Sequence, residues 1–241
     1  MIHKHLETCE STSIILKDTY EAQPDGATPL LVSTSHQVAG LGRMGNSWIG
    51  LENALALSFT LHSNPSVPTL TSLEVGVALV EFLNAHFKTN LKLKWPNDIL
   101  GPELHKVGGI LLQSLRGNLY CCGIGINLSD PSGELLKLER KAGQYPAGSI
   151  LESSAQPLTS VQKKELSHKI ANSILDRVYE LRSGDFKRVW NEHCAHLNQR
   201  VEIRDAHSVT SGYFRGVGPQ GEAQIEDGEI KRVYSGSLFI L

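Results

Sequence analysis

The sequence changes character near residue 199, and this change constrains the fold more than any other feature. Before it, apolar residues follow both the helical period and the alternation of strands. After it, only short strand-like runs occur, separated by turn residues such as Asp227-Gly228. These runs are residues 200–204, 209–217, 222–226, 229–234 and 237–241. We therefore expect an α+β domain over residues 1–198 and a small β-barrel over residues 199–241.

The first part contains both alternating strands and helices with an apolar stripe. Residues 55–61 place leucines and Phe59 on one face, which predicts a half-buried strand. Thr71 and Glu74 have the spacing of a capping box, which predicts the start of a helix at Thr71. Further strands are expected over residues 29–34, 91–95, 108–115 and 119–126, and further helices over about 160–182 and 185–197.

Charge and composition exclude several classes of function. The chain has 23 Lys plus Arg and 25 Asp plus Glu, so no overall basic field favours nucleic acid. No apolar stretch is long enough to span a membrane, and the N-terminus lacks the apolar core of a signal peptide. The four cysteines form no C-x-x-C pair, which indicates a reducing compartment. We expect a cytoplasmic protein that binds neither nucleic acid nor membranes.

A glycine-rich segment, Gly40-Leu41-Gly42-Arg43-Met44-Gly45, has the G-x-G-x-x-G spacing of a dinucleotide-binding turn. That function also needs a helix from the last glycine and an acidic residue about 20 positions later, and the sequence has neither. The glycines still let backbone N–H groups approach an anion, and Arg43 adds a guanidinium. Trp48 offers a flat face for a base. A surface loop followed by a core tryptophan is the alternative that this motif alone leaves open.

A second motif, Lys94-Trp95-Pro96-Asn97-Asp98, joins a lysine, an amide and a carboxylate where a strand ends. Such a set can hold Mg²⁺ and a phosphate ester, whereas an Asx turn that closes the strand is the structural alternative. Lys106 precedes Gly108-Gly109 and could present its ammonium across open backbone, or lie in solvent as an ordinary surface lysine.

A third glycine motif, Gly123-Ile124-Gly125-Ile126-Asn127, lies inside an expected strand. Glycines there imply the close approach of a ligand or of another backbone, and Asn127 could contact a ribose or a base. His193 and His196 have no accompanying carboxylate pattern, so a metal site at these histidines is disfavoured. The sequence contains neither G-x-S-x-G nor a P-loop motif, which argues against a serine hydrolase and a P-loop ATPase.

Taken in order, these motifs resemble the biotin protein ligase family across nearly the whole chain. The resemblance is carried by the glycine segment, Lys94-Trp95-Pro96-Asn97-Asp98, Lys106-Val107-Gly108-Gly109-Ile110-Leu111, Gly123-Ile124-Gly125-Ile126-Asn127-Leu128 and Ala147-Gly148-Ser149-Ile150-Leu151. It implies a mixed sheet packed against helices and a C-terminal SH3-like barrel. It also implies that ATP activates biotin to biotinyl-AMP. The biotin then passes to a lysine of a biotin carboxyl carrier protein, as in acetyl-CoA carboxylase.

The resemblance also implies roles for individual residues. Those expected beside biotin are Ser11, Thr12, Ser13, Gln37, Gly40, Leu41, Gly42, Arg43, Lys106 and Gly109. Those expected beside ATP are Arg43, Trp48, Lys94, Asn97, Asp98, Lys106 and Asn127. Lys106, Arg43 and Lys94 are expected to be the catalytic cations, and Asp98 to bind Mg²⁺. Leu41 and Asn46 replace two arginines of the family's glycine loop, and Ser13 replaces an asparagine. We expect the lost guanidinium contacts to weaken retention of the adenylate.

Several alternatives stay open at this point. A lipoate ligase or octanoyltransferase shares the fold of the larger domain, although it should lack the Lys94–Asp98 run. A DNA-binding repressor is disfavoured, because the ten residues before Ser11 are too few for a helix-turn-helix domain. A non-enzymatic module that binds biotin or a nucleotide is the third. The sequence leaves open whether the protein forms a homodimer.

Overall fold

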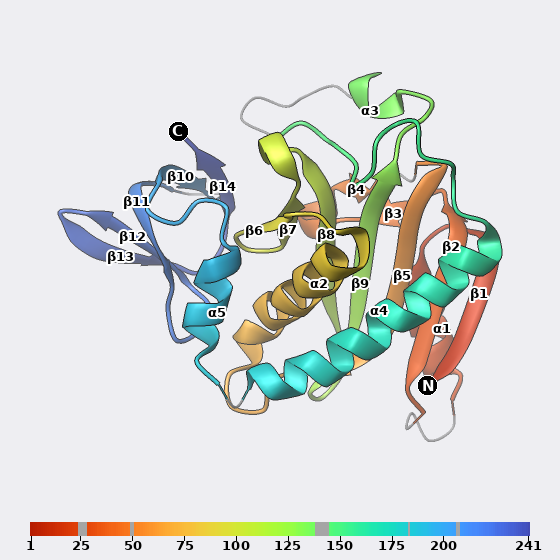
Figure 1. Ribbon diagram of the computed structural model, residues 1–241. Coiled ribbons are helices and arrows are strands. Elements are labelled where there is room, and N and C mark those ends of the chain that lie inside the picture. Colours follow the sequence, from red (N-terminus) through yellow and green to blue (C-terminus); the bar gives the residue numbers. More distant parts are fainter. Residues whose placement is uncertain (24–27, 49–50, 138–144, 183, 206–207) are drawn as a thin grey trace.

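A seven-stranded mixed sheet forms the centre of the molecule, and a five-stranded antiparallel sheet lies beside it (Figure 1). The computed structural model describes residues 1–23, 28–48, 51–137, 145–182, 184–205 and 208–241. The larger sheet has the order β1-β2-β5-β9-β8-β7-β6, in which β1 and β2 are parallel and all other neighbours antiparallel. Its strands are β1 (Ile2–Cys9), β2 (Leu30–Gln37), β5 (Asn53–His62), β6 (Lys92–Lys94), β7 (Asp98–Leu100), β8 (Lys106–Arg116) and β9 (Leu119–Ser129).

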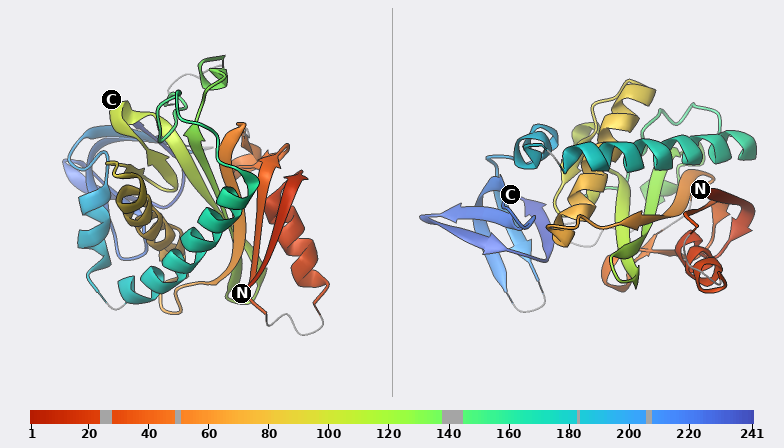
Figure 2. Two further views of the ribbon diagram at one scale, coloured as in Figure 1. Left: turned by 45° about the vertical axis from the view of Figure 1, so that its right-hand side comes forward. Right: turned by 90° about the horizontal axis from the view of Figure 1, so that it is seen from below.

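Helices cover both faces of this sheet (Figure 2). On one face lies α1 (Thr12–Glu21), and on the other lie α2 (Thr71–Phe87) and α4 (Ser160–Leu181). The prediction that β5 is half-buried is therefore wrong, because every residue from Asn53 to Leu61 is buried. The small residues between its leucines fit under α1, so the alternation reflects side-chain size rather than exposure to water. The mixed sheet packed against helices is confirmed.

The expected capping box at the start of α2 is also wrong. The N-cap position is Leu70, whose side chain makes no capping hydrogen bond. Glu74 is instead buried, where it accepts a hydrogen bond from Asn64 Nδ2 at 2.5 Å and pairs with Arg182 at 3.3 Å. A capping box does occur at α4, where the side chains of Thr159 and Gln162 bond each other's backbone N–H groups.

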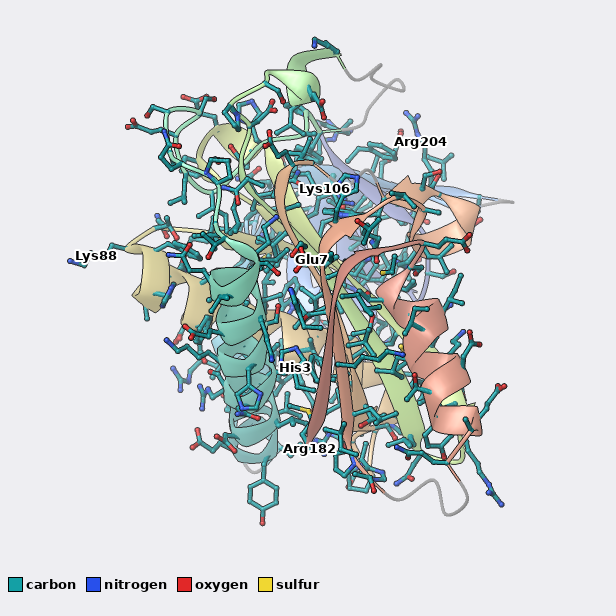
Figure 3. All side chains as sticks on the ribbon, turned by 90° about the vertical axis from the view of Figure 1, so that its right-hand side faces the viewer. His3, Glu7, Lys88, Lys106, Arg182 and Arg204 are labelled. Atoms are coloured by element: carbon teal, nitrogen blue, oxygen red, sulfur yellow. The ribbon has the colours of Figure 1, made fainter. Side chains whose placement is uncertain are left out.

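The N-terminal end of α4 lies against β1, an edge strand of the larger sheet, and against its neighbour β2 (Figure 3). Glu7 lies beside this end of the helix, where it accepts a hydrogen bond from Ser160 at 2.6 Å. His3 stacks on His168 further along the helix, with 5.8 Å between ring centroids. Polar contacts therefore fix the helix along the sheet edge in addition to its apolar stripe.

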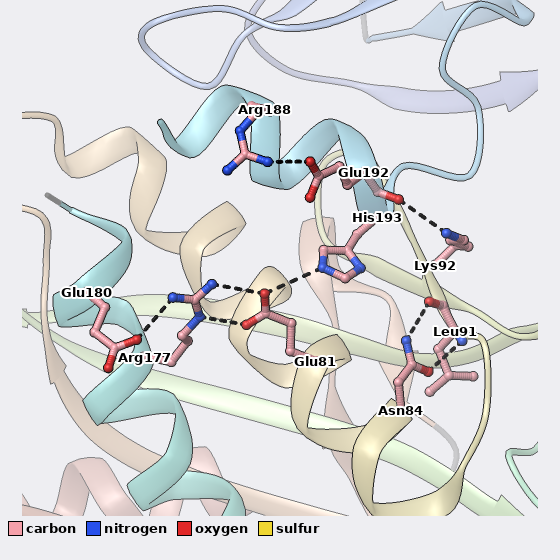
Figure 4. Close-up of polar contacts among 9 residues, drawn as sticks. All are labelled: Glu81, Asn84, Leu91, Lys92, Arg177, Glu180, Arg188, Glu192 and His193. Carbon is pink, nitrogen blue, oxygen red and sulfur yellow. Dashed lines mark hydrogen bonds and ion pairs between the residues drawn. The ribbon is translucent and has the colours of Figure 1, made fainter. Parts of the chain in front are cut away.

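An ion-pair group at the C-terminal half of α4 joins three helices (Figure 4). Glu81 of α2 accepts two hydrogen bonds from the Arg177 guanidinium of α4, at 2.6 and 3.0 Å. His193 of α5 (Phe186–His193) lies 3.6 Å from the same carboxylate. Helix α5 is shorter than the predicted 185–197, because the backbone becomes extended at Cys194. This group positions the helix that leads into the smaller sheet.

The smaller sheet confirms the predicted C-terminal strands. They are β10 (Arg200–Arg204), β11 (Val209–Val217), β12 (Ala223–Asp227), β13 (Glu229–Val233) and β14 (Ser237–Ile240). Their order is β13-β12-β11-β10-β14. Among the described residues the outer strands β13 and β14 do not pair, so the sheet is open and not closed into a barrel. The remaining short elements are β3 (Gly40–Leu41), β4 (Ser47–Trp48), α3 (Glu134–Lys137) and 3₁₀ turns at Arg43–Gly45, Pro68–Leu70 and Pro102–Leu104. No helix in the described ranges is long and apolar enough to cross a membrane.

Candidate active site

A cavity of about 500 Å³ opens where β8 and β9 meet the start of α1, the glycine segment and β14. All but one of the predicted site residues line it. These are Ser11, Thr12, Ser13, Gln37, Leu41, Gly42, Arg43, Trp48, Lys94, Asn97, Asp98, Lys106, Gly109 and Asn127. The exception is Gly40, where an added Cβ would lie 2.5 Å from Gln37 Nε2. Gly40 thus allows the close packing of Gln37 without lining the cavity itself.

Glycines form the floor of the cavity. Gly123, Gly125 and Asn127 share one face of β9, since side chains alternate along a strand. A Cβ at Gly123 would lie 2.8 Å from Ser13 Oγ, and a Cβ at Gly125 only 2.4 Å from Trp48 Cε2. The sequence predicts that a ligand or another part of the chain approaches these glycines closely. In the structure Ser13 of α1 approaches Gly123, and the Trp48 indole approaches Gly125. A side chain at either position would push the cavity wall outward.

Two lysines converge on the single carboxylate that lines the described cavity. Lys94 Nζ lies 2.8 Å from Asp98 Oδ2, and Lys106 Nζ lies 2.7 Å from Asp98 Oδ1. Burial alone would raise the pKa of Asp98, but the two ammonium groups hold it below its usual value. Lys94 is buried with 7 % of its side chain exposed, whereas Lys106 is 36 % exposed and faces the cavity. The result is a fixed positive site with one net charge.

Arg43 adds a second cation from the glycine segment. Its Nη1 donates a hydrogen bond of 3.0 Å to Asn97 Oδ1, and Asn97 Nδ2 donates to the Ile110 carbonyl at 2.8 Å. Burial lowers the pKa of the guanidinium, and the Asp98 carboxylate opposes that shift. A lowered arginine pKa still leaves the group charged at neutral pH. Asn97 therefore positions Arg43 against strands β6 to β8, which carry the two lysines and Asp98.

Hydroxyl and amide groups near Thr12 form a hydroxyl-rich end of the cavity. Gln37 Oε1 accepts hydrogen bonds from the Thr12 backbone N–H at 2.9 Å and from Thr12 Oγ1 at 3.2 Å. Ser58 Oγ lies 2.8 Å from Thr12 Oγ1 and 3.0 Å from Ser13 Oγ. Hydroxyls can each donate and accept, so this group suits a ligand head that carries both donors and acceptors.

Two buried polar atoms face this site without a hydrogen-bond partner in the described structure. They are Trp48 Nε1 and Asn127 Oδ1. The other side of the Asn127 amide is fixed, because its Nδ2 donates to the Gly148 carbonyl at 3.0 Å. Buried polar atoms are normally satisfied, so an unpaired donor and acceptor at a cavity wall indicate that a ligand supplies the missing bonds.

Sequence reasoning missed one wall of the cavity. Tyr145 and residues 236–239 line it, the latter from the turn into β14 and from β14 itself. The Lys94 ammonium lies 5.4 Å from the centre of the Tyr145 ring, and the Tyr145 hydroxyl accepts a hydrogen bond from Ile240 N at 3.0 Å. No motif marks these residues. The position of Tyr145 close before Ala147-Gly148-Ser149 was the nearest available signal.

The predicted Mg²⁺ site at Asp98 does not fit this arrangement. Both carboxylate oxygens already pair with ammonium groups. The described residues also contain no cluster of three or more His, Cys, Asp or Glu side chains that could hold a metal ion. Asp98 is therefore the shared partner of the two lysines and not a metal ligand in this arrangement.

Comparison with known proteins shows which family the chain belongs to. Residues 7–129 match the model of the biotin/lipoate A/B protein ligase family, and the chain belongs to that family. The biotin–protein ligase of Homo sapiens is 29% identical over 92% of this chain. The biotin–[acetyl-CoA-carboxylase] ligase of Paracoccus denitrificans is 26% identical over 79% of this chain and 81% of its own length.

The fold is also that of solved structures. The biotin protein ligase of Aquifex aeolicus in complex with biotin and ATP superimposes with a TM-score of 0.76 at 23% identity, over 99% of each chain. This chain spans 32% of the length of the human relative and 66% of that of the bifunctional ligase/repressor BirA of Bacillus spizizenii.

Proposed function

We propose that this protein is an ATP-dependent biotin protein ligase. It activates biotin to biotinyl-5′-AMP and transfers the biotin to a lysine of a carboxylase's biotin carboxyl carrier domain. The observation that carries the proposal is the pairing of two environments in one cavity. A hydroxyl-rich end at Thr12 and Ser13 and a cationic end at Lys106 and Arg43 line the same cavity. Biotin has a ureido head with donors and an acceptor, and a carboxylate tail.

In the first step, a biotin carboxylate oxygen forms a bond to the α-phosphorus of ATP, and the bond from that phosphorus to pyrophosphate breaks. Charge builds on the phosphate oxygens in this transition state, and fixed cations stabilise it. Lys106, already held by Asp98, and Arg43, held by Asn97, are the groups placed to do so. They need little reorganisation, because their partners fix them before the ligands arrive.

In the second step, the acceptor lysine's amine attacks the carbonyl carbon of the mixed anhydride, and AMP leaves. No enzyme nucleophile is required. The protein positions the reactants and excludes water that would hydrolyse the anhydride. We assign Trp48 and Asn127 to the nucleotide side, since each brings an unpaired buried polar atom to this cavity.

The hydroxyl-rich end favours biotin over lipoate. The dithiolane ring of lipoate offers no conventional hydrogen-bond donors, so it would leave the Thr12, Ser13 and Gln37 group without ligand bonds. We therefore expect lipoate to bind more weakly than biotin. The family includes both ligase types, so this comparison separates the two candidate functions.

The decisive experiment is ATP-dependent labelling of an acceptor. The purified chain is mixed with ATP, Mg²⁺, an acceptor carrier domain and either biotin or lipoate. We expect a mass increase on the acceptor with biotin and ATP together, and none when either is omitted. Labelling by lipoate at an equal or higher rate would contradict the proposal. Binding of biotin without any pyrophosphate release would instead indicate the non-enzymatic module.

Two further expectations belong with this function. The acceptor is expected to be a carrier domain of the acetyl-CoA carboxylase type, as the name of the Paracoccus relative states for that enzyme. The protein is expected to work in the cytoplasm, and its four cysteines are free thiols, as a reducing compartment requires.

A further inference from the structure

A buried lysine outside the cavity contacts the backbone on both sides of the glycine segment. Lys163 lies in the first turns of α4, and 4 % of it is exposed. Its Nζ donates a hydrogen bond of 2.9 Å to the Ser35 carbonyl and one of 2.8 Å to the Glu52 carbonyl. Ser35 precedes the segment that carries Arg43 and Trp48, and Glu52 follows it.

These contacts occur where the strand ladder ends. β2 and β5 pair from Leu31 opposite Phe59 up to Thr34 opposite Ala56. The register between the two strands ends at that pair, and the stretch of chain that links β2 to β5 carries the glycine segment and Trp48. The Lys163 ammonium takes the place of ladder hydrogen bonds at this point. Without it, the Ser35 and Glu52 carbonyls would lose an ionic hydrogen-bond donor.

Further bonds fix the same end of α4. Asn53, which is fully buried, accepts from Leu158 N at 3.1 Å and donates to Ser129 Oγ at 2.7 Å. Ser160 lies within hydrogen-bond distance of Glu7 and His5 on β1. The N-terminal end of α4 is therefore fixed relative to Ser35 and Glu52, and Lys163 makes the contact from the helix to both of them.

Keeping a lysine buried has a cost that packing alone does not explain. Burial lowers the pKa of Lys163, and the Glu52 and Glu7 carboxylates oppose that shift. A leucine or methionine would fill the same volume without removing a charge from water. The two carbonyls are the hydrogen-bond partners of the ammonium, so they account for a donor at this position.

We propose that Lys163 is a positioning residue. It holds together the two stretches of backbone that flank the glycine segment, so that Arg43 and Trp48 keep their places at the cavity. The inference rests on the proposed function for its kinetic consequence, and on the fold alone for its structural one. Lys163 touches no substrate, so it acts through the segment and not on the reacting atoms.

The test compares Lys163→Met with Lys164→Met. Lys164 is the exposed neighbour on the same helix, so the second variant controls for loss of a lysine from α4. In Lys163→Met we expect the KM for biotin and the rate of biotinyl-AMP escape to rise about tenfold, because displaced groups bind the intermediate poorly. The kcat at saturating biotin should change less than the KM, and Lys163→Arg should restore most of the loss.

Amide hydrogen exchange tests the same proposal without ligands. The amides of Ala39 and Gly42 bond the carbonyls of Glu10 and Asn46, at 2.8 and 2.7 Å. These amides should exchange faster in Lys163→Met, while core amides of β9 should not. Unchanged exchange and an unchanged KM in a folded variant would overturn the proposal. If Lys163→Met does not fold, Lys163→Gln is measured, and native exchange and KM in it would overturn the proposal equally.

The two readouts separate this proposal from the function it rests on. If the native protein forms no adenylate, the proposed function fails, and hydrogen exchange still decides the role of Lys163. If the native protein is active and exchange at Ala39 and Gly42 does not respond to Lys163→Met, only the positioning role fails.

Discussion

At the scale of single residues, Lys106 is the cation best placed to act on the substrates. It lines the cavity, is partly exposed, and is held 2.7 Å from Asp98. We expect Lys106→Ala to lower biotin-dependent pyrophosphate release about 10²- to 10³-fold, the typical effect of removing one group that stabilises transition-state charge. Lys169→Ala, an exposed lysine on α4, is the control. Near-normal release from folded Lys106→Ala would exclude Lys106 from catalysis.

Asp98 has the complementary role of keeping two ammonium groups together. Replacing it by asparagine leaves Lys94 buried beside an uncharged side chain, so we expect Asp98→Asn to lower the free energy of unfolding by about 3 kcal/mol at pH 7. The pKa of Asp98 is lowered in the fold. Its stabilisation is therefore present above the unfolded value of about 4 and is lost as the pH falls through the lowered pKa.

Denaturant unfolding of both proteins at pH 7 and at pH 3 measures this difference. The gap between native protein and Asp98→Asn should narrow at the lower pH. A gap that stays the same at both values would show that the carboxylate charge does not stabilise the pair of lysines.

Arg43 tests the role of the glycine segment in keeping the intermediate. The resemblance implies arginines at the positions of Leu41 and Asn46, and Arg43 is the one guanidinium that the glycine segment carries. We expect Arg43→Ala to speed the escape of biotinyl-AMP about tenfold to a hundredfold, since one ionic hydrogen bond contributes about 1.5–3 kcal/mol. The release of preformed biotinyl-AMP, followed by rapid filtration, measures this rate. Escape at the native rate would mean that Arg43 does not contact the adenylate.

At the scale of elements, much of the fold could be predicted because strand and helix periods are local. The hairpin of β8 and β9, helices α2 and α4 and the five C-terminal strands follow from such patterns. β1 and α1 were not predicted, since the charged and polar residues of Ile2–Cys9 hide a sheet-edge strand. The burial of both faces of β5 depends on which helices pack above and below it. The local pattern of apolar residues does not carry that information.

The candidate site divides in the same way. Residues in motifs were found, because each motif combines residue types that packing alone does not require. Tyr145 and β14 were missed, because they reach the cavity only through the packing of the smaller sheet on the larger one. Lys163 carried no signal either, since its two partners are backbone carbonyls.

Strand β9 gives a prediction at this scale. A Cβ at Gly125 would lie 2.4 Å from Trp48 Cε2, so Gly125→Ala must displace the indole from the cavity floor. We expect the KM for ATP to rise about tenfold while the fold is retained, because a small displacement of a binding group has a large effect. Trp95 and Trp190 are fully buried, so a change in tryptophan emission reports on Trp48. The emission of Trp48 should shift toward that of exposed indole.

Gly184→Ala is the matched control for this change. A Cβ at Gly184 meets no atom within 4 Å, so this variant should keep both the KM and the fluorescence. An unaltered Trp48 signal in Gly125→Ala would mean that the indole does not lie against β9 in solution.

At the scale of the whole molecule, the two sheets share one apolar core. Leu238 and Phe214 of the smaller sheet belong to the same buried cluster as Leu57 and Val80 of the larger part. Trp95, at the hairpin of β6 and β7, donates a buried hydrogen bond of 3.0 Å to the Gly221 carbonyl. The division into domains at residue 199 stays a prediction about sequence, and the shared core argues that the two parts unfold together.

Calorimetry tests this unity. We expect a single transition whose calorimetric and van't Hoff enthalpies agree, since two-state unfolding requires one cooperative core.

Trp95→Phe removes the hydrogen bond to Gly221 and keeps most of the ring, so it should lower the free energy of unfolding by about 1–2 kcal/mol. The transition should still be single, because the apolar contacts between the sheets remain. A second, separate transition in the native protein would show that residues 199–241 unfold independently, and the wall of the cavity at β14 would then open without loss of the larger sheet.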